Sequence, residues 1–195
     1  WHGATAGVGI LISDSLMFQR GDPTPSDPNL SHVYGLALPF LKRGIPIQPV
    51  QLENAPLPGA FDAFRVLLLS YHGQKPLSPD VHTALAAWVR RGGRLVVCDD
   101  DSDPYNQVRE WWNTAGRTYA TPRAHLFNEL GIRDDEAPQA RGSGRVLWVR
   151  KNPAGIAAAK DGDTGWIAAV KAVAGDAVAW REALDEASDG ASVQA

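Results

Sequence analysis

Short apolar runs that alternate with helix-like segments constrain the fold of this chain more than any other feature. Residues 8–13 and 65–71 are nearly unbroken apolar stretches, which is typical of strands buried on both faces of a sheet. Residues 47–52 alternate between apolar and polar, so we expect this strand nearer a sheet edge. Residues 94–98 and 145–149 complete a set of five predicted strands.

Helical patterns fill most of the segments between these strands. The first begins at a cap, Ser31, and is stopped by Gly44, although Pro39 interrupts it. The second starts with Ser78 as cap and Pro79 in the first helical position, and it ends at residues 92–93. Further helices are predicted at residues 105–112, 122–130, 164–173 and 178–184. Strand and helix in alternation predict an α/β fold, a flavodoxin-like open parallel sheet with helices on both faces.

Length and composition favour one globular domain. The 195 residues suit a single core, and 44% hydrophobic with 21% charged residues is ordinary for such domains. We expect residues 1–7 to be an overhang left by excision from a longer chain, residues 8–187 to be the domain, and residues 188–195 to be frayed. A net charge of −3 argues against nucleic acid as a partner, and no apolar run is long enough to cross a membrane. The localisation cannot be inferred.

Polar residues gather where the predicted strands end. In a doubly wound sheet, ligands bind beyond the carboxyl ends of the strands, near the point where the strand order reverses. The residues expected at this edge are Asp14, Ser15, Tyr71, His72, Gly73, Asp99, Asp100, Asp101, Asp103, Lys151 and Asn152. Asp14, His72, Asp99, Asp100 and Asp101 are the candidate ligand-binding residues. The competing interpretation is that these acidic residues only form turns and caps.

Two residues are candidates for catalysis, Cys98 and His72. Cys98 ends a strand, but a nucleophilic thiolate needs a lowered pKa, and the three aspartates that follow Cys98 would raise it. We therefore favour a structural role for this lone cysteine. His72 beside Gly73 could act as an acid, a base or a ligand, or could simply hydrogen-bond the backbone.

The acidic cluster that follows Cys98 has oxygen ligands of the kind that Ca²⁺ and Mg²⁺ prefer. The regular spacing and the glycine of a calcium-binding loop are absent, so we expect no metal and no cofactor. Trp111 and Trp112 cannot both point inward from one helix, so one of them is expected at a surface, an interface or a sugar-stacking site.

Four segments in order carry a resemblance to a known family. They are PLSP at residues 76–79, WVRRGGRLVV at residues 88–97, LFNELGI at residues 126–132 and GSGRV at residues 142–146. Together they resemble the class I glutamine amidotransferase-like superfamily, most closely the trimerisation-type accessory domains of β-galactosidases and related glycoside hydrolases. The resemblance spans residues 8–173 and implies a flavodoxin-like domain that takes part in assembly or shapes the mouth of a catalytic barrel.

The family's catalytic pattern is missing here. Active members carry a Gly-x-Cys-x-Gly elbow and a later His-x-Glu pair, but Val96 and Asp100 flank Cys98, and residues 150–152 offer no His-x-Glu. The resemblance therefore implies a noncatalytic accessory domain whose partners are other domains of the same polypeptide; a homo-oligomer and a carbohydrate ligand stay open. The alternative is a degenerate hydrolase, or a small-ligand or sugar binder, that uses the crevice at the strand ends.

Overall fold

The computed structural model describes residues 7–18 and 27–180, which form one six-stranded sheet in the order β2-β1-β3-β4-β6-β5. The first five strands of this order are parallel, and β5 is antiparallel to β6. The strands are β1 (Val8–Ile12), β2 (Gln48–Gln51), β3 (Val66–Leu69), β4 (Arg94–Cys98), β5 (Gln139–Arg141) and β6 (Gly144–Val149). The predicted α/β open sheet is thereby confirmed, while the flavodoxin-like subtype stays a prediction.

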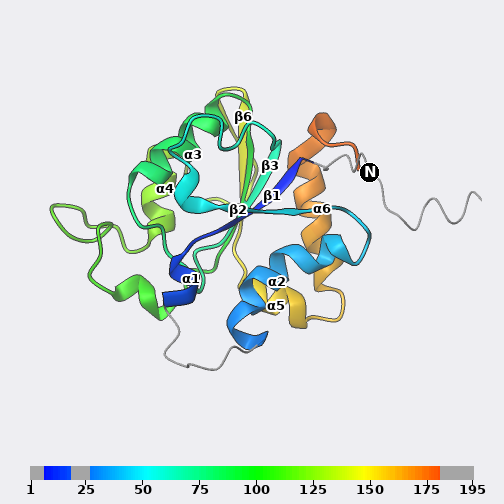
Figure 1. The fold of residues 1–195 in the computed structure, drawn as a ribbon, viewed down its shortest axis with the longest axis horizontal. Coiled ribbons are helices and arrows are strands. Elements are labelled where there is room, and N and C mark those ends of the chain that lie inside the picture. The colour runs from blue at the N-terminus through cyan, green and yellow to red at the C-terminus, as the bar shows by residue number, and fades with distance from the viewer. Residues whose placement is uncertain (1–6, 19–26, 181–195) are drawn as a thin grey trace, which may run out of the picture.

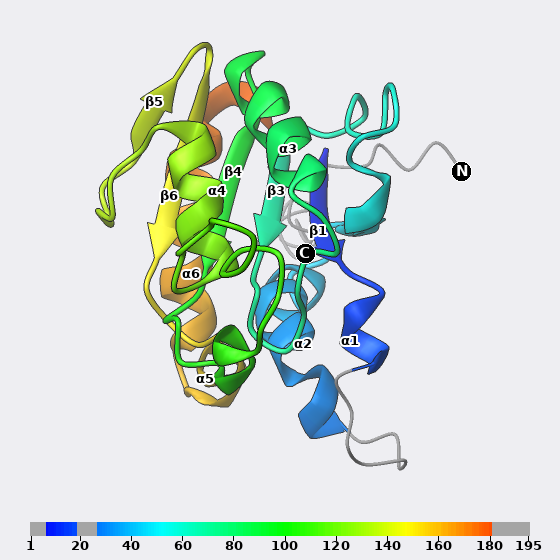
Figure 2. The same ribbon diagram turned by 90° about the vertical axis from the view of Figure 1, so that its left-hand side faces the viewer.

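Helices cover both faces of the sheet (Figures 1 and 2). They are α1 (Ser15–Phe18), α2 (Asp27–Leu41), α3 (Asp80–Arg90), α4 (Pro122–Leu130), α5 (Pro153–Ala158) and α6 (Gly162–Ala174), with short 3-10 turns at Leu52–Asn54, Pro104–Gln107 and Gly175–Ala177. Figure 1 shows α3 and α4 on one side of the sheet and α2, α5 and α6 on the other. In the parts of the chain that the structure describes, none of the helices has the length and apolar character needed to span a bilayer.

Two apolar cores result from the alternation of side chains along the strands. Leu67 and Leu69 of β3 enter the core under α3 and α4, whereas Val66 and Leu68 enter the core under α2 and α6. Because β3 is buried on both faces, it can carry no polar side chain. This explains the continuous apolar run that revealed the strand in the sequence.

Several predicted boundaries differ from the structure. The second strand is an edge strand as expected, but β5 and α5 were not predicted, because a three-residue strand and a six-residue helix carry too little periodicity. Ser78 does not cap α3, since Pro79 occupies the cap position and no side chain bonds there. The helix predicted over residues 105–112 is only a 3-10 turn, Pro104–Gln107.

Other predictions concern the two ends of the chain and the helix that precedes β5. The predicted overhang, apart from Gly7, lies outside the described residues, as does the predicted frayed tail. Residues 178–180 are not helical, which contradicts the start of the last predicted helix, and residues 181–184 lie outside the described residues. The predicted helix at residues 122–130 agrees with α4, whose cap Thr121 accepts a hydrogen bond from the Ala124 N–H and whose end is Gly131, with a φ of 67°.

A close backbone contact fixes α2 against α5. A Cβ placed on Gly35 would lie 1.8 Å from the carbonyl oxygen of Pro153, so only glycine fits there. In contrast, a Cβ on Gly155, two residues after Pro153 in α5, would meet no atom within 4 Å. The two glycines therefore form a matched pair for testing this contact.

We predict that Gly35→Ala destabilises the protein by about 1–3 kcal/mol, because the added methyl group must push α5 away. Gly155→Ala should be neutral or stabilising by up to about 1 kcal/mol, because alanine is the better helix former. Urea unfolding followed by circular dichroism measures both. Equal effects of the two substitutions would contradict the packing described here.

Candidate functional site

The carboxyl ends of β1, β3 and β4 meet at the edge of the sheet where the strand order reverses, since β1 lies between β2 and β3. Three loops gather there: residues 13–15 after β1, residues 70–75 after β3 and residues 99–103 after β4. The loop after β6, with Asn152, closes the same edge from α5. Most predicted site residues lie in these loops, so we build the site from them.

The aspartates after β4 first of all shape their own loop. Asp99 accepts the Asp101 N–H, Asp100 accepts the N–H and hydroxyl of Ser102, and Asp103 accepts the Tyr105 N–H at the start of the 3-10 turn. Asp101 has a φ of 60°, a left-handed conformation that aspartate tolerates better than most residues. The turn-and-cap interpretation therefore describes these residues well, but it does not account for all their contacts.

Two of these aspartates also tie the loop after β3 to the loop after β4. The second carboxylate oxygen of Asp99 accepts the Tyr71 N–H at 2.9 Å, and that of Asp103 accepts the Gly73 N–H at 2.7 Å. Burial raises the pKa of Asp99, against the opposing effect of the N–H donors of Asp101 and Tyr71. The two loops thus form one hydrogen-bonded unit.

Asp103 and Lys75 form a buried ion pair with an Nζ to Oδ2 distance of 2.7 Å, and Lys75 Nζ also donates to the Tyr71 carbonyl. Burial lowers the pKa of Lys75, and the hydrogen bond that Lys75 donates to Asp103 partly offsets this effect. Burial works against the ionisation of Asp103, but Lys75 and the N–H groups of Gly73 and Tyr105 lower its pKa overall. The lysine is therefore a structural cation of the loop after β3.

Asp101 is held by Arg123 of α4 in a fork of hydrogen bonds of 2.7 to 3.0 Å. The same guanidinium bonds Asp134 at 2.9 Å and stacks over the Trp148 ring, with Cζ 3.9 Å from its centroid. Arg123 is almost fully buried. The side chain of Asp101 is thus paired with a structural arginine, and not with the side chains of the other candidate ligand-binding residues.

Asp14 belongs to a different set of contacts, beside β2. Its carboxylate accepts from the Gln51 side chain at 2.6 Å. Its neighbours Ser13 and Ser15 bond the carbonyl of Lys75, and the Gln74 side chain spans from β1 to β3. The hydrogen bonds of Asp14 are therefore made within the loops after β1 and β2.

His72, Asp99 and Asp100 are the predicted residues that the fold brings together. One potential metal-binding atom from each lies within 4.8 Å of the others. His72 Nδ1 is 3.8 Å from Asp100 Oδ1, and it is a buried atom without a hydrogen-bond partner among the described residues. Burial opposes ionisation of Asp100, but the Ser102 hydrogen bonds and the neighbouring His72 lower its pKa overall. This His72/Asp99/Asp100 cluster is the candidate functional site.

Sequence reasoning missed His32 of α2, whose ring stacks on His72 with centroids 4.0 Å apart. Burial, and next the neighbouring His72, lower the pKa of His32 to about 4, so it is neutral near pH 7. Its Nδ1 is also buried without a partner in the described structure. No local signal marks His32, because it reaches the edge only through the packing of α2.

Cys98 points into the core under α2 and α6 and is fully buried. Its Sγ lies 3.4 Å from the carbonyl oxygen of Lys151. Burial, followed by the charges of Asp99 and Asp100, raises the pKa of the thiol far above its ordinary value. The arrangement therefore disfavours a thiolate, in line with the structural role expected from the sequence.

A second buried polar chain crosses beneath Trp111. Tyr71 Oη is 2.6 Å from His82 Nε2, and His82 Nδ1 is 2.9 Å from His125 Nδ1. Trp112 is 1% exposed, and the half-buried Trp111 donates its indole N–H to the Pro76 carbonyl and packs against both histidines. Trp112 is therefore the inward-pointing member of the pair, and Trp111 is the one nearer the surface.

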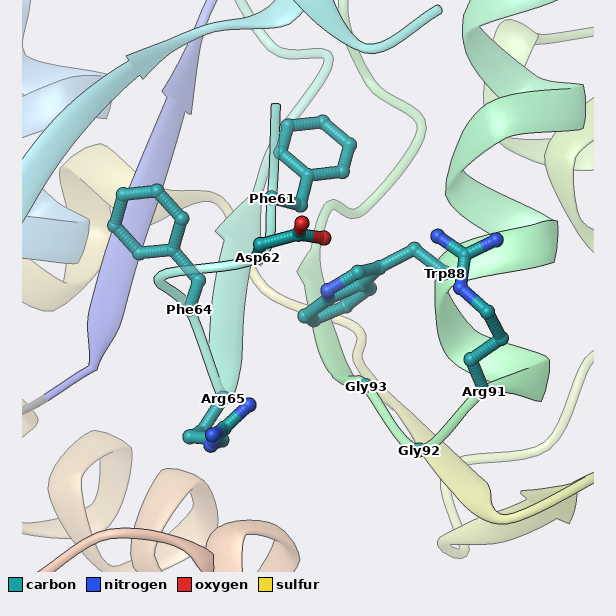
Figure 3. Close-up of a pocket in the computed structure, with 8 residues that line it drawn as sticks. All are labelled: Phe61, Asp62, Phe64, Arg65, Trp88, Arg91, Gly92 and Gly93. Carbon is teal, nitrogen blue, oxygen red and sulfur yellow. The ribbon is translucent and has the colours of Figure 1, made fainter. Parts of the chain in front are cut away.

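A pocket of about 300 Å³ lies at the opposite end of the strands, next to Arg65 and Gly93, which precede β3 and β4. Figure 3 shows its aromatic walls, Phe61, Phe64 and Trp88, together with the charged residues Asp62, Arg65 and Arg91. This pocket contains none of the predicted site residues. In open α/β sheets ligands bind at the carboxyl edge, so the cluster at that edge remains the candidate site.

Comparison with known proteins gives no further guide: no protein-family model matches the chain, and no curated protein matches it. The assignment of the site therefore depends on its geometry alone.

We predict that the free energy of unfolding falls as the pH is lowered from about 6.5 towards 4. Burial lowers the pKa values of His32, His82 and His125 in the folded protein, so the unfolded chain takes up protons first in this range. Each such proton contributes a slope of up to about 1.4 kcal/mol per pH unit. Urea unfolding at several pH values measures the slope.

His82→Leu provides the comparison for this slope. The variant should be less stable at pH 7 by about 1–3 kcal/mol, because Tyr71 Oη and His125 Nδ1 lose their partner. Its stability should nevertheless depend less on pH between 6.5 and 5. A slope as steep as that of the unaltered protein would refute the assignment of His82 as a neutral buried group.

Proposed function

We propose that this domain carries out no amide or glycoside hydrolysis of its own and serves as a noncatalytic accessory domain of a carbohydrate-active enzyme. The observation that carries the first part of the proposal, the absence of amide hydrolysis, is the burial of Cys98, whose Sγ faces the Lys151 carbonyl in the core. A nucleophilic thiol needs a base within hydrogen-bond reach and access to substrate. In the described structure Cys98 has neither.

Three exposed apolar or aromatic side chains on neighbouring loops support an assembly role. Leu77, Tyr105 and Val108 are 58%, 41% and 44% exposed. They lie on two loops that are joined by the hydrogen bond from Trp111 to the Pro76 carbonyl. Exposed apolar groups of this kind are suited to contact with another protein surface, and we propose that another domain of the same polypeptide covers them.

The proposal predicts that the Cys98 thiol of the native domain reacts with a thiol reagent only as fast as the protein unfolds, and at once in guanidinium chloride. Because Cys98 is the only cysteine of the chain, the signal is unambiguous. The domain should also release no ammonia from glutamine and cleave no aryl galactoside, with or without Cys98→Ala. Turnover that Cys98→Ala abolishes would overturn the proposal.

The assembly role needs a separate experiment, in the enzyme that carries the domain. Leu77→Ser together with Val108→Ser should weaken assembly or lower glycosidase activity several-fold, whereas Asp62→Asn at the opposite edge should not. Size-exclusion chromatography with light scattering and a glycosidase assay provide the readouts. Unchanged assembly and activity, also after deletion of residues 8–187, would show that the domain is not an accessory domain.

A second function, binding of a small ligand at the carboxyl edge, is favoured by one observation. His72, Asp99 and Asp100 come from separate loops and converge, and His72 Nδ1 is left without a hydrogen bond in the described structure. Buried polar atoms nearly always have a hydrogen-bond partner, so the unpaired His72 Nδ1 beside two carboxylates favours the binding of a ligand there.

A further inference from the structure

The charges at the carboxyl edge are unevenly compensated. Asp101 is paired with Arg123, and Asp103 is paired with Lys75. Asp99 and Asp100 have no lysine or arginine within ion-pair distance among residues 7–18 and 27–180, although Asp99 is only 2% exposed. Two neighbouring carboxylates, one of them buried, thus lack a lysine or arginine partner in the described structure. A bound cation would supply the counter-charge.

The third side chain of the cluster identifies the kind of cation. His72 Nδ1 faces Asp100 Oδ1 at 3.8 Å, and the ligand atoms of all three residues lie within 4.8 Å of one another. Around a metal ion with bonds of about 2.0–2.2 Å, ligand atoms lie about 3 to 4 Å apart. A closure of about 1 Å, within the reach of side-chain rotation at half-exposed Asp100, would complete the geometry.

The His72 ring is already held in place before any ion arrives. His32 of α2 stacks on its face, and Asn152 Nδ2 donates to its Nε2. Gly73, with a φ of 76°, keeps the space next to His32 free, because a Cβ there would approach His32 Nδ1 to 3.1 Å. A fixed ring loses little freedom on binding a ligand, which favours affinity.

We propose that His72, Asp99 and Asp100 bind a divalent first-row transition metal ion, with Zn²⁺ or Co²⁺ as the probe. An imidazole nitrogen with two carboxylates suits these ions, whereas Ca²⁺ and Mg²⁺ prefer an all-oxygen set. Water would fill the remaining positions. The proposal names the ligand for the second function given above and does not depend on the accessory role.

Asn152 determines which ring nitrogen of neutral His72 carries the proton, and metal binding must move that proton. Its Oδ1 accepts the Ala154 N–H as the cap of α5, so its Nδ2 donates to His72 Nε2, at 3.3 Å. The proton of neutral His72 therefore lies on Nδ1. Binding through Nδ1 moves this proton to Nε2, where it meets an amide nitrogen in place of an acceptor.

Because two N–H donors would then face each other, replacing the Asn152 amide with an acceptor should strengthen metal binding. In Asn152→Asp a carboxylate oxygen would accept the Nε2 proton, as in the carboxylate–histidine–metal arrangement of many metal sites. Aspartate caps a helix as well as asparagine, so α5 should remain intact. We expect Asn152→Asp to tighten metal binding about tenfold.

The experiment is titration of the untagged 195-residue protein with ZnCl₂ by calorimetry, and with CoCl₂ by visible absorption. We expect one ion per chain, a melting temperature that rises with Zn²⁺, and no effect of MgCl₂ or CaCl₂. His72→Ala and Asp100→Asn should weaken binding at least tenfold. Asp62→Asn, at the opposite edge, should leave it unchanged. These variants avoid Asp99, which also accepts two backbone N–H groups.

Three outcomes would overturn the proposal: no binding of Zn²⁺ at millimolar concentration, binding that survives His72→Ala, or an affinity that Asn152→Asp leaves unchanged. The thiol-labelling and hydrolysis assays involve no metal, so the accessory proposal and the metal proposal fail separately.

Discussion

The burial of β3 on both faces is the constraint on which the rest of the structure depends. All four of its side chains are completely buried, so the two helix layers and the neighbouring strands β1 and β4 must be in place together. The chain that leaves β3 carries backbone N–H groups that need partners. The carboxylates of Asp99 and Asp103, which follow β4, accept those of Tyr71 and Gly73. The packing of β3 in the core therefore also determines how the loops at the carboxyl edge are arranged.

This arrangement determines which side chains remain available for chemistry. Asp101 and Asp103 are held by structural cations, and Cys98 points away from the edge into the core. What remains is the His72/Asp99/Asp100 cluster, in which an imidazole nitrogen faces carboxylates that lack a lysine or arginine in the described structure. The site is thus better suited to holding a cation than to nucleophilic attack.

Much of the fold could be predicted from the sequence, because strands buried on both faces leave unbroken apolar runs, as at β3, and because Gly131 ends α4. The short β5 and α5 could not, since pairing and packing with neighbours stabilise them and local periodicity does not. Of the five predicted ligand-binding residues, His72, Asp99 and Asp100 converge, whereas Asp14 and Asp101 bond elsewhere. The position of a residue in the sequence can place it at the edge of the sheet. Which partner its side chain contacts depends on distant segments, as with Arg123, which pairs with Asp101, and His32, which stacks on His72.

His72 keeps Nδ1 without a hydrogen bond in the described structure and open towards the carboxylates. Nitrogen-15 NMR of the histidine rings tests this arrangement most directly. In the metal-free protein we expect an unprotonated His72 Nε2, which accepts from Asn152 Nδ2, and a proton on Nδ1. On addition of Zn²⁺ the proton should move to Nε2, while the His82 and His125 signals stay constant. A metal-free His72 with its proton on Nε2, or Zn²⁺-induced changes at the other histidines only, would contradict it.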